Sequence, residues 1–161
     1  MRKIISITLL VFITSMIGCR DKSRPGDLPA LYPCTITITQ EGKLLEGAAV
    51  TFEPIDSSSV KYRATAITGV DGSATMNTYG FSGVPIGKYK VVIAKIIQDD
   101  IEYKLNESTG KNEPVSYKRY RTVEPQFSSA ETTPHEIEIT GKEKKAEHIF
   151  DVGKAMKTLI P

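Results

Sequence analysis

The chain has 161 residues, enough for one domain with one hydrophobic core. Its 21 Lys+Arg and 19 Asp+Glu give a formal net charge of +2, which offers no electrostatic case for a nucleic-acid partner.

Residues 1–18 have the pattern of a bacterial lipoprotein signal peptide. Arg2 and Lys3 are followed by a mostly apolar run over 4–17, which is shorter than the roughly 20 residues of a membrane-spanning helix. A glycine and Cys19 end this run and resemble a lipobox, whose chemistry is diacylglyceryl transfer to the thiol and cleavage before the cysteine. We therefore predict a lipoprotein with a fatty acyl (palmitate) anchor at Cys19. An ordinary signal peptide with an incidental cysteine is the alternative.

Cleavage before Cys19 removes two basic residues and no acid, so the mature chain is neutral. Residues 19–33 contain three prolines and are predicted to be an extended tether between lipid and domain. Arg20 stands where an aspartate would resemble an inner-membrane retention signal. The expected location is thus the cell envelope, on the outer membrane facing the periplasm. With Cys19 acylated, Cys34 has no disulfide partner and is expected to be a small buried residue, a reactive thiol being the alternative.

Short alternating segments predict an all-β fold for residues 34–152. Residues 35–39 alternate threonine with isoleucine, and 47–53 place Val50 and Phe52 on an inward face. A third strand is expected over 61–68. Because no sustained helical period occurs, the spacing favours an antiparallel sandwich.

Residues 64–94 read as strand, tight turn, strand, Gly/Pro loop and strand. Asp71-Gly72 supplies the positive φ that a short hairpin needs. After the loop, Tyr89, Val91 and Ile93 are predicted to begin a buried face.

The C-terminal half begins with a predicted long hairpin insertion, residues 99–122. Its arms carry opposite charge and can attract each other. A loop and two further strands, over 135–140 and 146–152, complete the domain. Residues 153–161 are expected to be a short C-terminal tail of one helical turn.

Two motifs carry a resemblance to a known family. Gly42–Phe52 and the Gly-x-Pro-x-Gly-x-Tyr-x-Val element at Gly83–Val91 resemble transthyretin-like, or carboxypeptidase regulatory-like (prealbumin-like), domains. Such domains occur in short lipoproteins of diderm bacteria, notably of planctomycete type. Leu44 and Gly69 depart from the pattern, where proline and aspartate are common. The resemblance implies a seven-strand prealbumin/Ig-like β-sandwich, usually without a known activity.

Few residues support catalysis. His135 and His148 lie in different predicted strands, and no metal-binding His-x-x-x-His or Cys-x-x-Cys spacing occurs. The transthyretin-like hydrolases of the purine pathway end in a Tyr-Arg-Gly-Ser-type tail, whereas this chain ends in Lys-Thr-Leu-Ile-Pro. We therefore expect no enzymatic activity, no metal and no cofactor.

The predicted role is structural or interacting, with an envelope protein or a glycan as partner. A carbohydrate- or peptide-binding module is the alternative, since the hairpin groups aromatic rings with guanidinium groups. Exposed side chains of an ordinary hairpin explain the same pattern without a ligand. The candidate ligand surface consists of Tyr103, Tyr117, Arg119, Tyr120 and Arg121.

Overall fold

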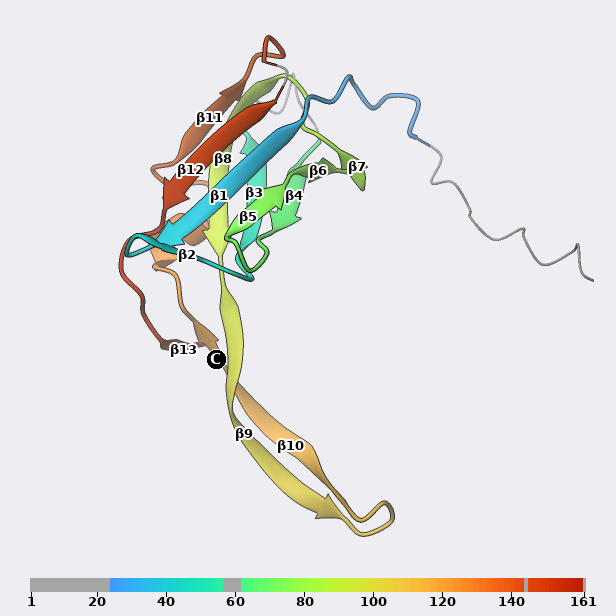
Figure 1. The fold of residues 1–161 in the computed structure, drawn as a ribbon, viewed down its shortest axis with the longest axis vertical. Coiled ribbons are helices and arrows are strands. Elements are labelled where there is room, and N and C mark those ends of the chain that lie inside the picture. Colours follow the sequence, from blue (N-terminus) through green and yellow to red (C-terminus); the bar gives the residue numbers. More distant parts are fainter. Residues whose placement is uncertain (1–23, 57–61, 144, 161) are drawn as a thin grey trace, which may run out of the picture.

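The computed structural model describes residues 24–56, 62–143 and 145–160, which form thirteen strands in three sheets and one 3-10 turn (Figure 1). The signal peptide and Cys19 lie outside these residues. The strands are β1 (Cys34–Gln40), β2 (Lys43–Leu44), β3 (Ala49–Pro54), β4 (Ala64–Ile67), β5 (Ser73–Thr75), β6 (Asn77–Thr78), β7 (Phe81–Ser82), β8 (Gly87–Ala94), β9 (Ile96–Asn106), β10 (Lys111–Arg121), β11 (Glu136–Ile139), β12 (Ala146–Asp151) and β13 (Thr158–Ile160). The turn is η1 (Pro125–Ser128).

Two of the sheets form a sandwich-like all-β body. One sheet has the order β12-β1-β2 with β5 also paired to β1, and the other has the order β11-β8-β3-β4-β6-β7. In Figure 1 the first sheet lies in front of β8 and β3. Buried side chains from both sheets belong to one hydrophobic cluster, which fills the space between them.

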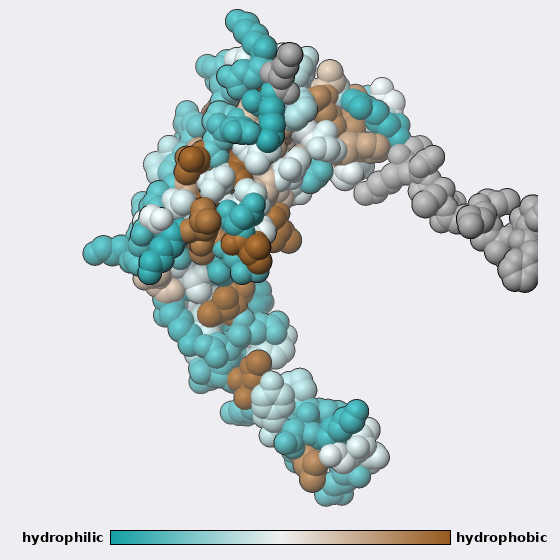
Figure 2. Space-filling model, in the orientation of Figure 1, coloured by the Kyte–Doolittle hydropathy of each residue, from teal (hydrophilic) through white to brown (hydrophobic). Residues whose placement is uncertain are grey.

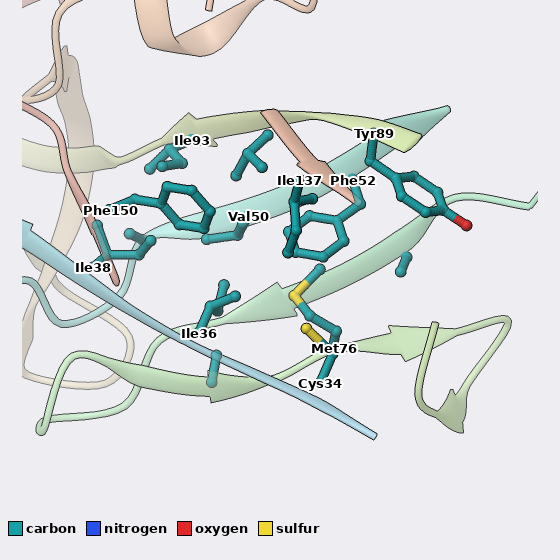
Figure 3. Close-up of a cluster of buried hydrophobic side chains, with 14 of the residues drawn as sticks. Cys34, Ile36, Ile38, Val50, Phe52, Met76, Tyr89, Ile93, Ile137 and Phe150 are labelled. Carbon is teal, nitrogen blue, oxygen red and sulfur yellow. The ribbon is translucent and has the colours of Figure 1, made fainter. Parts of the chain in front are cut away.

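The alternation read from the sequence produces this core. Ile36 and Ile38 of β1 are fully buried, while the threonines that alternate with them along the strand are half-buried on the outer face. From the facing sheet, Val50 and Phe52 point inward, as predicted (Figure 3). Because side chains alternate between the faces of a strand, each strand contributes one apolar row to the core.

The sandwich is not purely antiparallel, so that part of the expected topology is wrong. β1 and β12 are parallel neighbours, with Cys34 opposite Ala146 and Ile38 opposite Phe150. A short hairpin cannot join parallel strands, but more than a hundred residues separate these two. Their starts are fixed at the same end, where the Ala146 amide donates to the Pro33 carbonyl at 3.0 Å.

The Asp71-Gly72 turn forms, but it does not close the expected hairpin. β4 pairs with β3 and β6, whereas β5 pairs with β1, so the turn carries the chain from one sheet to the other. Gly72 has φ +65°, and a Cβ there would lie 2.9 Å from the Ile38 carbonyl oxygen. The turn therefore requires glycine both for its backbone angle and for its close approach to β1.

Both ends of the described chain attach to the domain more than the sequence suggested. Within the predicted tether, Leu28 is buried, and Tyr32 forms a two-way backbone bridge with Val84 at 2.9 Å. The C-terminal tail is not a helical turn, because Thr158–Ile160 forms strand β13 on β10. The third sheet, β13-β10-β9, is thus a hairpin reinforced at its base by the chain end.

Tyr89 gives a test of the core. Its ring is fully buried beside Phe52, with centroids 5.8 Å apart, and its hydroxyl donates to the Pro85 carbonyl at 2.9 Å (Figure 3). We expect Tyr89→Ala to lower the free energy of unfolding by about 3–5 kcal/mol, because it opens a cavity. Tyr89→Phe keeps the ring and should cost about 1 kcal/mol for the lost hydrogen bond. Equal effects of both variants in urea denaturation would contradict the assigned packing.

Candidate interaction surface

The hairpin β9–β10 projects away from the sandwich (Figure 1). Each arm has eleven residues, so the ribbon extends about 36 Å. Beyond the base, the side chains of both arms are exposed except for that of Asn106, which is half-buried. The sequence correctly predicted this hairpin, and the structure extends its first arm back to Ile96.

The register of the hairpin separates the residues predicted to form one ligand surface. Tyr120 pairs with Ile97 and with Leu159, so these three side chains share a face. Arg119 and Arg121 are its neighbours along β10 and therefore point to the opposite face. The predicted combination of Tyr120 with two guanidinium groups is not formed.

Tyr103 and Tyr117 lie farther out. Tyr103 pairs with Pro114, six positions from Tyr120 along β10, which corresponds to about 20 Å. Tyr117 falls where the register shifts between Ser116 and Lys118. The five predicted residues thus belong to one hairpin but do not form one platform.

Tyr120 has a structural role at the base of the hairpin. Its hydroxyl donates to the Asp100 carboxylate, and the Lys157 ammonium lies 4.4 Å from the centroid of its ring. Lys157 also donates to Asp99 at 2.5 Å, and Lys118 lies 3.7 Å from Asp100. This basal cluster, Asp99, Asp100, Lys118, Tyr120 and Lys157, joins the C-terminal strand to both arms. Sequence reasoning did not single out Lys157, because its contacts depend on the position of β13.

The basal cluster shifts the ionisation of its members. Hydrogen bonding from Lys157 and from the Asp100 amide lowers the pKa of Asp99 from its ordinary value. The same contact raises the pKa of Lys157, and the bond to Asp100 raises the pKa of Tyr120. Because Asp99 binds its proton less readily when folded, its contribution is present above about pH 3.9 and is lost as the pH falls through the lower, folded-state pKa.

Acid titration tests the attachment of β13. We expect the amide NMR signals of Thr158–Ile160 to shift with a midpoint below the ordinary aspartate value of about 3.9. Lys157→Gln should move that midpoint upward, because it removes the cation that holds Asp99 ionised. Lys154→Gln, which removes an equal charge from the same tail, should leave it in place. Identical midpoints in all three proteins would show that Lys157 does not clamp the tail.

The outer half of the hairpin exposes large apolar side chains without a sheet or helix to cover them. Ile101, Tyr103 and Leu105 of β9 and Val115 and Tyr117 of β10 are 42–60% exposed. Figure 2 shows hydrophobic side chains at intervals along this projection, between hydrophilic ones. A two-stranded ribbon is marginally stable in water, so these residues form a surface suited to a partner.

The two outer edges of the ribbon differ. β13 pairs with β10 over Arg119–Arg121, and Pro114 lacks the amide that a further strand on β10 would need. β9 contains no proline, and none of the described strands pairs with its outer edge. An unpaired edge of this kind accepts an added strand.

The histidines do not form a catalytic arrangement in the described chain. His135 stacks on Phe127 with centroids 5.2 Å apart, and its Nε2 lies 3.0 Å from the Asp151 carbonyl oxygen. His148 has a buried Nε2 without a hydrogen-bond partner. A hollow of about 420 Å³ is lined by both His148 and Glu147. Glu147, however, is paired with Lys145 at 2.7 Å.

The other predicted residues are placed as follows. Cys34 is buried in the core, which confirms the prediction of a small buried residue, and burial raises its pKa to about 11. Arg119 and Arg121 form no ion pair within the described residues. In the same part of the chain no three His, Cys, Asp or Glu side chains gather as a metal site would require.

Comparison with protein-family models, with curated proteins and with solved structures found no match. Among the residues with described structure, no helix has the length and hydrophobicity to cross a membrane.

Proposed function

We propose that this protein is a lipid-anchored cell-envelope protein whose sandwich is a non-catalytic support for an interacting hairpin. The observation that carries the proposal is the outer half of β9–β10, which exposes five large apolar side chains and one unpaired strand edge within the described chain. The sandwich also exposes apolar side chains such as Ile67 and Ile149, but it has a buried hydrophobic core that supports it, whereas the outer hairpin has none.

The positions of the two proposed contacts support this division. Residues 24–33, which lead from the proposed lipid site at Cys19, leave the sandwich at the end opposite the hairpin (Figure 1). Membrane attachment and hairpin binding would therefore use separate surfaces. The proposed location is the outer membrane, facing the periplasm.

A transthyretin-like family assignment belongs to the same proposal. Its support is the resemblance of the Gly83–Val91 element, in which Gly83 has φ +111° against Tyr32 and Tyr89 anchors the core. A glycan platform is less well supported, because Tyr120 and the two arginines point to opposite faces. A hydrolase has still less support, because neither histidine is bonded to a carboxylate in the described residues.

Shortening the hairpin tests whether it is the interacting element. Replacing residues 100–117 with Asn-Gly joins Asp99 and Lys118, which are already paired, through a two-residue turn. We expect the free energy of unfolding to change by less than about 1 kcal/mol, because the removed side chains are outside the core and loop-closure entropy varies slowly with length.

The same variant should lose the adducts that the wild-type protein forms when membranes are treated with a chemical cross-linker. Ile149→Ser, at a 74% exposed position on the sandwich, is the matched surface control and should keep them. A folded, shortened protein that retains every adduct would show that binding occurs elsewhere.

Lipidation is tested separately. We expect Cys19→Ala to abolish the acyl modification and to move the protein from the membrane to the soluble fraction, since two or three acyl chains anchor stably whereas none remains in the variant. Cys34→Ala removes the other thiol and should leave the protein in the membrane. Mass spectrometry of the mature N-terminus provides the direct check. A wild-type protein with an unmodified Cys19 would contradict the anchor.

A further inference from the structure

We propose that the outer edge of β9 pairs antiparallel with the same edge of a second copy, joining two ribbons into one four-stranded sheet. The inference rests on the proposed function in one respect, that the hairpin is the interacting element. It names the partner as another copy of this chain. The pairing segment is Ile101–Leu105, with the sequence Ile-Glu-Tyr-Lys-Leu.

The first argument is the need for further strands. The ribbon has three strands only at its base, where β13 lies beside Arg119–Arg121. Beyond that point it has two, although a two-stranded hairpin is marginally stable in water. Pairing through β9 would give four strands there and would satisfy an edge that no described strand occupies.

The second argument is that symmetry restricts the register. In an antiparallel pair, hydrogen-bonded and non-hydrogen-bonded residue pairs alternate. A two-fold axis perpendicular to the sheet must therefore pass between one residue and the same residue of the other copy. An axis midway between successive residue pairs would relate a hydrogen-bonded pair to a non-hydrogen-bonded pair, and these two cannot be equivalent. Each candidate register is thus specified by its central residue.

Charge then selects Tyr103 as the centre. A centre at Glu102 would place two glutamates opposite each other, and a centre at Lys104 would do so with two lysines. With Tyr103 at the axis, Glu102 of each copy lies opposite Lys104 of the other. Opposite charges in facing positions stabilise a strand pair, and like charges destabilise it.

The same register matches the apolar residues. Ile101 of each copy lies opposite Leu105 of the other, on the face that also carries Tyr103. The exposed fraction is 42% for Ile101, 57% for Leu105 and 60% for Tyr103. Pairing would therefore cover apolar surface that the single chain leaves in water. Glu102 and Lys104 occupy the other face, where the Ser116 hydroxyl already donates to Glu102 at 3.0 Å.

The body of the protein leaves room for this arrangement. Ile96, at the base of β9, lies seven residues from Tyr103, or about 23 Å along the strand. In the antiparallel pair the two sandwiches lie on opposite sides of the axis, their bases roughly 45 Å apart. The bodies are therefore far enough apart for the outer ribbons to meet.

Disulfide trapping in the full chain tests the register. Residues directly opposite in an antiparallel pair have Cα atoms about 4.5–5.5 Å apart, within the range that a disulfide spans. With copper(II) phenanthroline as oxidant, we expect Tyr103→Cys to form a covalent homodimer in membranes. Tyr117→Cys, on the other arm and similarly exposed, is the matched control, and the unsubstituted chain gives the background from Cys19 and Cys34.

Charge variants in the Tyr103→Cys background provide the second measurement. Glu102→Lys alone and Lys104→Glu alone each place like charges opposite one another twice, so each should lower the yield of homodimer at least threefold. Mixing the two differently tagged variants restores opposite charges between copies and should recover the yield as heterodimer. This recovery is not expected from a partner protein or from random collision.

Several results would overturn the pairing. The first is a homodimer yield from Tyr103→Cys that is no higher than the yield from Tyr117→Cys. The second is an adduct with a different protein in place of the homodimer, and the third is a dimer yield that does not recover when the two charge variants are mixed. If shortening the hairpin still removes adducts with another protein, the proposed function stands and only self-pairing fails. If it removes none and no homodimer forms, both fail.

Discussion

The fold depends on the core between the two larger sheets, and that core depends on the parallel pairing of β1 with β12. This pairing joins strands from the two ends of the domain and places Ile38 beside Phe150. Because it closes the sandwich without using β9 or β10, those strands can extend into solvent while the core stays intact. The side chains of the hairpin are therefore not needed for the packing of the core.

The base and the outer half of the hairpin are stabilised in different ways. At the base, Lys157 brings the C-terminal strand to Asp99 and covers the ring of Tyr120. These groups are exposed, and ion pairs in water contribute little individually, so they fix the position of the tail more than they stabilise the domain. The outer half has no comparable support within the described chain, which makes it the part whose stability would respond most to a partner.

Sequence reasoning predicted the parts of the fold that depend on local pattern. The alternation at Ile36 and Ile38, the buried face begun by Tyr89 and the projecting hairpin follow from residues close in the chain. The pairing errors had another cause. The Asp71-Gly72 turn has the same local chemistry whether the following strand pairs with β4 or crosses to β1, and only distant contacts decide between them.

The candidate site shows the same limit. Arg119, Tyr120 and Arg121 are adjacent in sequence, but a strand sends neighbours to opposite faces, so adjacency alone misled the prediction of a common surface. The contacts of Lys157 were not predicted, because the C-terminal tail was not expected to form a strand. Predicting these contacts would require the register of β9, β10 and β13, which the bulges at Ser116 make difficult to read from sequence.

The outer edges of β9 and β10 differ in the residues that protect them from pairing with other strands. Natural sheets commonly guard exposed edges with proline or with lysine, which discourage unwanted strand addition. β10 has Pro114 in this role, while β9 has Lys104 next to an exposed tyrosine and close to Glu102. A lysine on an edge discourages the addition of other strands, yet in one antiparallel register of identical chains Lys104 lies opposite a glutamate. The same residue can therefore oppose indiscriminate aggregation and favour one specific pairing, and this combination is what a controlled self-association through a strand edge requires.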